Sequence, residues 1–482
     1  MKKFFEKHDL FKIAGIMMLF TALLTWVFKY AVFNGAELMT FDQEVKGLAS
    51  ILDTSTIGLF DFNTYALLVL YYFTNIFVFV FVVFAFYKVL GKSNIYNSLV
   101  EKVAGLFKGK ELLLTVISLV FYTALTSVAT NHLIDLVFVP FTISLFAKLK
   151  TDKISTLISS FGGMLVGALG ATYSTTIVGA MIDYAGLNIK LGYEALSVIV
   201  MAVLAIVILT GLVYSRMKTG KKLEVTNDLF IEVEETKKKK HYNIIPLAIS
   251  LCVFAIVIIL AFMPWEGWNV TTFTNLHKSI TEATLLGGTY PIVFLGSQTL
   301  LPLGQWDLFT ASSFVIMTMF VASFISGVKF NSIIEGAAEG VKLSVKPVIL
   351  LAMVFTVLVF SVSFPVIPQF MNAINGMAKV EFLKPLSYFL NGVLASTFAV
   401  DMQYISRIAG GLFTTFDNAN VAALSLQAGY AFAGFIAPTS ALLMLGLSTL
   451  DIKFKDYFKF IWKFLIALAV IILIVLYILL YI

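Results

Sequence analysis

The sequence is poor in the residues that build metal centres, disulfide frameworks and soluble surfaces. It has one cysteine, Cys252, and four histidines in 482 residues, and only 13% of its residues are charged. A single cysteine excludes an internal disulfide framework. The chain contains no H-E-x-x-H, G-x-S-x-G or G-x-x-x-x-G-K-[ST] motif. The sequence therefore lacks the signatures of zinc proteases, serine hydrolases and P-loop ATPases.

Apolar residues are abundant: 59% of the chain is hydrophobic and the mean hydropathy is +0.94. This composition excludes an ordinary water-soluble globule and predicts an all-α integral membrane protein with the lipid bilayer as its partner. The net charge of +6 comes from lysines in short loops. It therefore indicates membrane topology, and no nucleic acid is expected as a partner.

Apolar runs of spanning length predict about nine spans, two of them broken by polar residues. The continuous spans are expected at 13–33, 64–87, 195–215, 244–263, 306–327, 347–370 and 460–482, and the broken spans at 154–185 and 421–446. Two further segments, 111–147 and 383–413, are interpreted as re-entrant helical hairpins because each is too short for two crossings. Segments 91–109 and 330–346 mix lysines with apolar residues and predict helices along the membrane surface.

Loop charges predict the orientation. With two hairpins, most lysines and arginines fall in loops on the side of the N-terminus. The positive-inside rule then places the N-terminus in the cytoplasm and the C-terminus outside, in a multi-pass protein of the cell (cytoplasmic) membrane. A single crossing at 111–147 would put the basic loop 216–243 outside, so it is disfavoured. Segment 284–303 has several glycines and prolines, and we expect it to be external or shallowly re-entrant.

The order of elements repeats along the chain. A first repeat, 1–215, and a second repeat, 306–482, each hold two spans, a hairpin, a broken span and a final span. They are separated by 216–305, which contains a cytoplasmic linker, the connecting span 244–263 and an external segment. Because the connecting span is a single crossing, the second repeat enters the membrane from the opposite face. Such inverted-topology repeats are typical of secondary transporters.

Polar residues interrupt both hairpins and both broken spans. Small hydroxyl residues, glycine and proline suit unwound helices, whose freed carbonyls and half-helix N-termini can bind ions and carboxylates. The candidate substrate- and ion-binding residues are Ser127, Thr130, Asn131, Thr172, Ser174, Thr175, Ser396, Thr397, Asp401, Arg407, Pro438, Thr439 and Ser440. The alternative is that small residues here merely allow close helix packing.

Charged residues are rare within these hairpins. His132 and Asp135 lie three positions apart and are interpreted as a local pair. Asp401 could bind sodium, accept a proton or meet a cationic substrate group. Arg407, one of only two arginines, could hold a carboxylate or pair with Asp401 or helix-end carbonyls. Beyond a possible sodium site at the hairpin tips, with Na+ or H+ as the coupling ion, no metal or cofactor is expected.

The C-terminal part carries a family resemblance. The segments Gln427-Ala-Gly429 and Pro438-Thr439-Ser440, with the glutamate-glycine segment 335–340, resemble the ion transporter superfamily, in particular its anaerobic dicarboxylate carrier and YfcC-like branch. That branch is related to aminobenzoyl-glutamate transporters and divalent-anion:sodium symporters. The resemblance implies a carrier, often a dimer, whose hairpin tips meet substrate and ion during an elevator-type movement. Thr130-Asn131-His132 and Asp401 both depart from the branch's usual tips.

The sequence thus favours a secondary active transporter of a small organic solute, by ion-coupled symport or exchange. Arg407 and helix N-termini suit a carboxylate, whereas Asp135 and Asp401 suit an amine, so an amino acid, possibly basic, and a dicarboxylate both stay open. An ion channel and a membrane-embedded enzyme are the alternatives. No filter signature or catalytic motif supports either of them, and we expect no enzyme activity.

Overall fold

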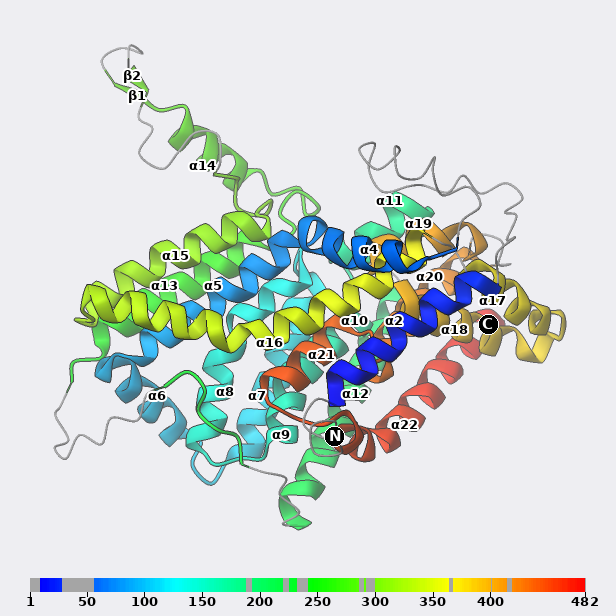
Figure 1. Cartoon of the computed structure of the whole chain (residues 1–482), viewed down its shortest axis with the longest axis horizontal. Coiled ribbons are helices and arrows are strands. Elements are labelled where there is room, and N and C mark those ends of the chain that lie inside the picture. Colours follow the sequence, from blue (N-terminus) through cyan, green and yellow to red (C-terminus); the bar gives the residue numbers. More distant parts are fainter. Residues whose placement is uncertain are drawn as a thin grey trace.

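The structure is a computed structural model that describes residues 9–27, 56–187, 193–219, 225–231, 242–285, 290–291, 300–363, 367–399, 401–413 and 418–481. These residues form a bundle of helices, shown in Figure 1. Eight of the described helices are long and apolar enough to cross a membrane. The helical membrane class is therefore confirmed, while nine spans and an inverted repeat stay predictions.

The first part of the chain contains short helices as well as long ones. Its elements are α2 (Asp9–Val27), α4 (Leu59–Tyr72), α5 (Thr74–Gly91), α6 (Asn94–Leu106), α7 (Glu111–Val128), η2 (His132–Val137), α8 (Val139–Lys148), α9 (Lys153–Leu157), η3 (Ile158–Gly162), α10 (Gly163–Leu169), η4 (Thr175–Gly179), α11 (Ala180–Ala185) and α12 (Tyr193–Thr219).

The connecting region and the C-terminal part follow. Their elements are α13 (Ile245–Ala261), α14 (Thr272–Thr281), β1 (Thr284–Leu285), β2 (Tyr290–Pro291), α15 (Leu308–Ile325), α16 (Phe330–Ser363), α17 (Ile367–Asn375), η6 (Gly376–Lys379), η7 (Glu381–Leu383), α18 (Lys384–Ala399), α19 (Met402–Phe413), α20 (Ala419–Ile436), α21 (Ala441–Thr449) and α22 (Phe454–Tyr481).

The expected span 64–87 is not one helix. It divides at Phe73, whose φ of −112° and ψ of 20° end α4 before α5 begins. The hydroxyl of Thr74 donates to the carbonyls of Leu70 and Tyr71, so a side chain competes for helical carbonyls at this point. The prediction of a single continuous span is therefore wrong, and α5 alone has the length of a span.

The expected surface helix at 330–346 is also wrong, because it continues through Pro347 into the 34-residue helix α16. Its N-terminal half packs against α5. A Cβ on Gly340 would lie 2.5 Å from the Cα of Ala85, and one on Gly336 would lie 3.0 Å from the Cα of Val89. Only glycine fits this close approach. The N-terminal half of α16 can therefore pack directly on α5. At 91–109 a separate helix, α6, is present.

The segment that begins at 284 holds the strands of the described chain. Thr284 pairs with Pro291 and Leu285 with Tyr290 in an antiparallel hairpin. Figure 1 shows β1, β2 and α14 projecting away from the helical bundle. The first part of 284–303 is therefore a short hairpin outside the bundle, and residues 286–289 and 292–299 lie outside the described residues.

Each predicted hairpin packs on the first half of the following broken helix. In the first, Tyr122 of α7 bonds to Thr142 of α8, with 2.7 Å between their hydroxyl oxygens, so the limbs run antiparallel. A Cβ on Gly167 of α10 would lie 2.4 Å from the Cβ of Thr126. In the second, a Cβ on Gly429 of α20 would lie 2.5 Å from the Cα of Gly392 in α18. Glycine thus permits the same close crossing in both halves.

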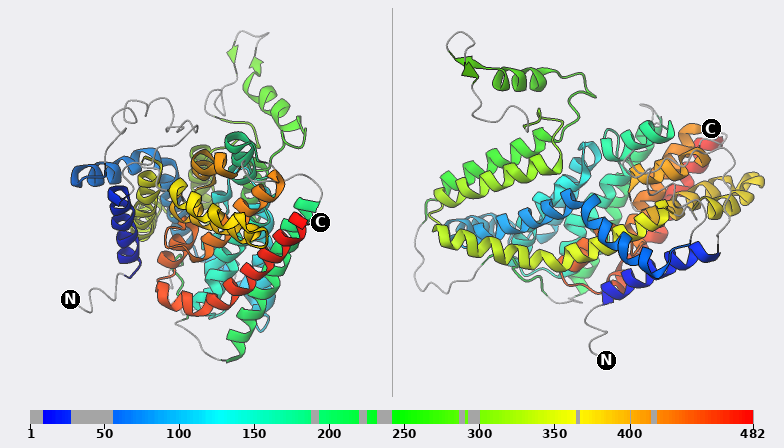
Figure 2. Two further views of the ribbon diagram at one scale, coloured as in Figure 1. Left: turned by 90° about the vertical axis from the view of Figure 1, so that its right-hand side faces the viewer. Right: turned by 45° about the horizontal axis from the view of Figure 1, so that its top comes forward.

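Helices from the two halves interleave in space. In Figure 1, α5, α13, α15 and α16 lie together at one end, and the contacts α16 with α5, α15 with α5, and α13 with α15 agree. At the other end, α18 and α22 both pack on α20, and Figure 2 shows α12 and α22 side by side.

Candidate functional site

The first polar break is stabilised by backbone bonds between the hairpin and the broken helix. Helix α7 ends at Val128 and α10 ends at Leu169. The N–H of Thr172 donates to the carbonyl of Ser127 at 3.1 Å, and the N–H of Thr130 donates to the carbonyl of Phe262 at 2.7 Å. Unwound backbone at membrane depth requires such partners. The predicted tip residues are therefore part of a bonded network.

Gln427 connects the second half of the chain to this break. It is fully buried on α20, and its amide nitrogen donates to the carbonyls of Leu169 at 2.8 Å and Ala171 at 2.9 Å. These carbonyls lie where α10 ends and have lost their helical donors. One side chain of the second broken helix thus satisfies the freed carbonyls of the first.

The second polar break, between α20 and α21, is also stabilised by hydrogen bonds. Helix α20 ends at Ile436, and the hydroxyl of Ser440 accepts from the N–H of Leu443 at 3.3 Å, which caps the start of α21. The hydroxyl of Thr439 donates to the carbonyl of Thr397 in α18. Pro438 stands between the two half-helices, where it has no N–H to leave unpaired. This break is therefore bonded to its own hairpin.

A cavity lies where the two predicted hairpins meet the two broken helices. His132 and Leu133 come from the first hairpin, and Ser396 and Asp401 come from the second. The broken helices contribute Leu165, Ala168, Tyr430, Ala431, Ala433, Gly434, Ala437, Ser440, Ala441 and Leu442. Ile76 of α5 and Phe355 of α16 complete the lining. The wall is mostly apolar, with a few polar side chains at the hairpin tips, as in many small-molecule sites.

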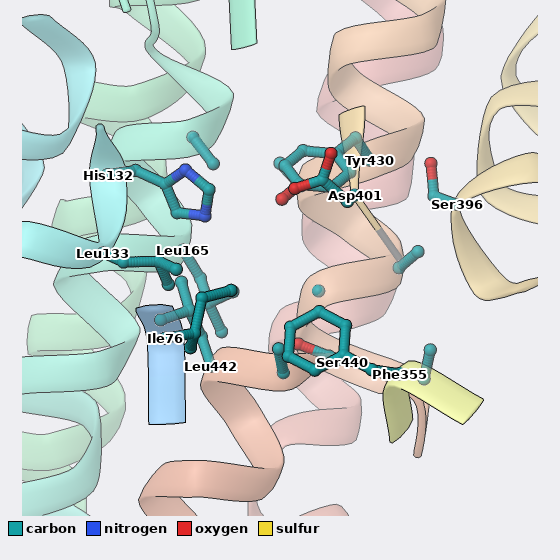
Figure 3. A pocket seen from close by; sticks show the side chains of 16 residues that line it. Ile76, His132, Leu133, Leu165, Phe355, Ser396, Asp401, Tyr430, Ser440 and Leu442 are labelled. Atoms are coloured by element: carbon teal, nitrogen blue, oxygen red, sulfur yellow. The ribbon is translucent and has the colours of Figure 1, made fainter. Parts of the chain in front are cut away.

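Asp401 and His132 face this cavity from opposite sides, as Figure 3 shows. Asp401 begins α19, and its carboxylate accepts from the N–H of Gln403 at 2.9 Å. A negative charge at a helix N-terminus is stabilised by the exposed N–H groups. The Nδ1 of His132 lies 2.9 Å from the hydroxyl of Thr176. Among the described lining residues Asp401 is the one carboxylate, and none is a lysine or arginine.

Three of the predicted site residues, Ser396, Asp401 and Ser440, line the cavity. The others that bond nearby hold the breaks together: Ser127, Thr130, Asn131, Thr172, Ser174, Thr397 and Thr439. Thr175 begins η4, and Pro438 lies in the break between α20 and α21. The expected residues thus come together, most of them as supports of the site.

Arg407 lies elsewhere than the cavity wall. Its guanidinium carbon lies 4.2 Å from the ring centre of Tyr184 in α11, which is a cation–π contact. Its Nε has no hydrogen-bond partner among the described residues, and no ion pair with Asp401 forms. Arg407 of the second hairpin therefore stacks on the second half of the first broken helix.

The predicted pair of His132 and Asp135 is wrong, because each bonds to a different helix or turn. Asp135 is fully buried and accepts from the hydroxyl of Thr126 in α7. His132 instead meets Thr176, which sequence reasoning did not select. Residues three apart in the 3-10 turn η2 share one side of it, so the pair is prevented by the competing partners Thr126 and Thr176 and not by the backbone. Tyr430 and Gln427 were also missed, because isolated polar residues in an apolar helix carry no spacing signal.

The fold and site define a polytopic helical membrane protein with a cavity at its broken helices. The sequence matches the C4-dicarboxylate anaerobic carrier (DcuC) family over residues 8–481. The chain belongs to this family. It is therefore a membrane-embedded carrier of a small organic solute. The expected resemblance to dicarboxylate carriers is confirmed at the family level, whereas the YfcC-like branch stays a prediction.

Two solved structures are similar over nearly their whole length. The YdaH transporter of Alcanivorax borkumensis has 9% identity and a TM-score of 0.43, with 97% of this chain and 97% of that chain covered. MtrF of Neisseria gonorrhoeae, described with a class of antimetabolite efflux pumps, has 11% identity and a TM-score of 0.34, with 97% and 94% covered. No curated protein matches the chain.

Proposed function

We propose that the chain is a secondary active transporter whose solute carries both a carboxylate and an amino group, so that it moves an amino acid, with basic amino acids among the candidates. The observation that carries this proposal is the single cavity at which both hairpin tips and both broken helices meet. The chemistry of its wall then selects the solute. Asp401 is half-buried at the cavity, and a substrate ammonium group would supply its carboxylate with a positive partner.

The carboxylate of the solute has partners on the same wall. Ser440 begins α21, and the N–H groups of the first turn of a helix attract anions. His132 lies across the cavity and can donate a hydrogen bond from its ring. An amino acid would therefore meet opposite chemistry at its two ends, with its ammonium group at Asp401.

A C4-dicarboxylate is the second candidate, because the family carries that name. It would bring two negative charges to a wall that already holds Asp401 and, among its described residues, no lysine or arginine. Its binding would require a protonated Asp401 or a co-transported cation. Neutral hydroxyl and carbonyl oxygens at the hairpin tips are suited to sodium. The coupling ion is thus proposed to be Na+ or H+.

The transport movement is proposed to be of the elevator type. Ile76 of α5 and Phe355 of α16 contribute one wall of the cavity, and the hairpins and broken helices contribute the rest. The cavity therefore lies at the boundary between two groups of helices. Sliding of the second group past the first would carry the solute across. We further propose re-entrant hairpins, an inverted repeat, a cytoplasmic N-terminus and a possible homodimer.

Uptake into proteoliposomes tests the function. The panel is arginine, ornithine, malate, succinate and a dipeptide, each with and without a sodium or proton gradient. Saturable uptake of an amino acid that depends on one gradient is the expected result. Uptake of succinate or malate alone would replace the first candidate with the second. Currents without saturation would instead indicate a channel and contradict the carrier.

A further inference from the structure

Three cavities follow one another along the same two helices, α5 and α21. Beside the central cavity lies a second, and beyond it a third. Along α5, Ile76 lines the first, Val80 the second, and Phe84 both the second and the third. Residues four apart share a helix face, so one stripe of α5 borders all three.

The opposite wall repeats this order. On α21, Leu442 lines the first cavity, Leu445 the second and Thr449 the second and third. In the first hairpin, Leu133 lines the first cavity and Leu136 the second. The third cavity ends at Lys346 and Asp451, an exposed ion pair with 2.9 Å between Nζ and Oδ1. The series therefore runs from the central site to a charged surface.

Residues 225–231, here called the strap, cross this series. Phe230 of the strap is fully buried and lines both the second and the third cavity. Its ring meets that of Phe84 edge-on, with 5.3 Å between centroids. The two phenylalanines therefore stand together at the junction of the outer two cavities.

The strap is attached to both groups of helices. At one end, the N–H of Thr226 donates to the carbonyl of Thr151 at 2.8 Å, and the Thr156 and Thr226 hydroxyl oxygens are 2.8 Å apart. Ser144 of α8 donates to Asp228 at 3.2 Å, and partial burial raises the pKa of Asp228.

At its other end the strap lies on α5. A Cβ on Gly91 would be only 1.7 Å from the carbonyl oxygen of Phe230, so the strap backbone rests directly on that glycine. Lys88 also donates to the carbonyl of Leu229 at 3.5 Å. These contacts hold Phe230 in the junction, and they are few and local compared with the packing of a transmembrane helix.

We propose that the three cavities form the route between the central site and the side expected to be cytoplasmic, and that Phe230 on the strap closes this route. The inference rests on the proposed carrier function. Because the strap bonds to α8 and α9 at one end and to α5 at the other, a sliding movement between these groups must release one end. Release at α5 withdraws Phe230 and opens the junction.

Thiol labelling tests the closure without any transported solute. Cys252 is exposed and is the one cysteine of the chain, so Cys252→Ser gives a cysteine-free background. Val80→Cys then reports on the second cavity, inside Phe230, and Leu343→Cys reports on the third, outside it. A charged, membrane-impermeant thiol reagent is added to the cytoplasmic side. We expect Leu343→Cys to react much faster than Val80→Cys.

Two changes should open the junction independently. Phe230→Ala removes the ring, and Gly91→Val displaces the strap while leaving Phe230 in place. Each should raise the labelling rate of Val80→Cys roughly tenfold or more, the change that a loss of about 1.4 kcal/mol of strap attachment produces. Phe86→Ala is the matched control, because Phe86 is a buried phenylalanine of α5 that packs on Phe254, away from the cavities.

Equal rates at positions 80 and 343 in otherwise unchanged protein would overturn the proposal, even if the strap variants fail to fold. So would an equal increase from Phe86→Ala, since that would show general loosening of α5. Labelling that follows the expected pattern supports the closure whether or not any solute of the uptake panel is carried. Failure of the carrier function and failure of the closure are therefore distinguishable.

Discussion

Gln427→Met is the sharpest test of how the two halves are joined. The change keeps the length and burial of the side chain but removes both hydrogen bonds to Leu169 and Ala171. Hydrogen bonds between membrane helices contribute roughly 0.6 kcal/mol on average and up to about 1.7. An unsatisfied buried carbonyl costs about 1–3 kcal/mol. Because the two carbonyls share one donor group, we expect Gln427→Met to lower the free energy of unfolding by about 1–4 kcal/mol.

Thermal unfolding of the purified protein in detergent gives the readout. Gln403→Met is the matched control, because the Gln403 amide makes one 3.2 Å bond to the hydroxyl of Tyr184 and is only partly buried. Its expected effect is within about 0.5 kcal/mol. If Gln427→Met were no more destabilising than Gln403→Met, the carbonyls at the first break would have other partners. The described contact between the two broken helices would then be wrong.

Three further predictions address packing, burial and stacking. Gly340→Val should lower the free energy of unfolding by about 1–3 kcal/mol, because its Cβ would lie 2.5 Å from the Cα of Ala85. The control Gly105→Val, with open space around it, should not lower it. Equal losses in the two variants would contradict the close helix contact. Asp135→Asn should leave the free energy of unfolding nearly unchanged, because Asn can keep the hydrogen bond to Thr126. Thr126→Val, which removes that bond, should lower it by about 1 kcal/mol. A much larger loss from Asp135→Asn would show that the negative charge itself is needed. Arg407→Lys should lower the free energy of unfolding by about 0.5–1 kcal/mol, because it weakens the contact with Tyr184. This loss should vanish in a Tyr184→Leu background. If the loss were undiminished there, Arg407 would act through another contact.

Hydropathy predicted the helical membrane class, and the polar interruptions marked segments that line the cavity, whereas the re-entrant hairpins stay a prediction. These features follow from rules that act along the chain: spanning length, loop charge and helix-breaking residues. Thr172 and Thr439 were selected because they interrupt apolar helices, and both contribute bonds at the breaks. Local pattern was therefore sufficient to find where the helices break, and the binding role of these residues stays a prediction.

Contacts between distant segments could not be predicted in this way. The partner of His132 is Thr176, 44 positions away, and the partner of Gln427 is the end of α10. The division of the span at Phe73 depends on how one threonine hydroxyl competes for carbonyls, and hydropathy does not report that. The continuation of segment 330–346 into one long helix, α16, depends on glycines that fit closely against α5. Each of these outcomes is set by tertiary packing.

The central claim is that the cavity at the four breaks binds the solute and that Asp401 holds its amino group. The most direct measurement is the KM for amino-acid uptake in wild type, Asp401→Asn and the control Asp183→Asn, an exposed aspartate on α11. Loss of a charge-assisted hydrogen bond of about 1.5–3 kcal/mol predicts a KM that rises roughly 10- to 100-fold in Asp401→Asn alone. An unchanged KM in that variant, or improved succinate uptake with no amino-acid uptake in wild type, would contradict the account.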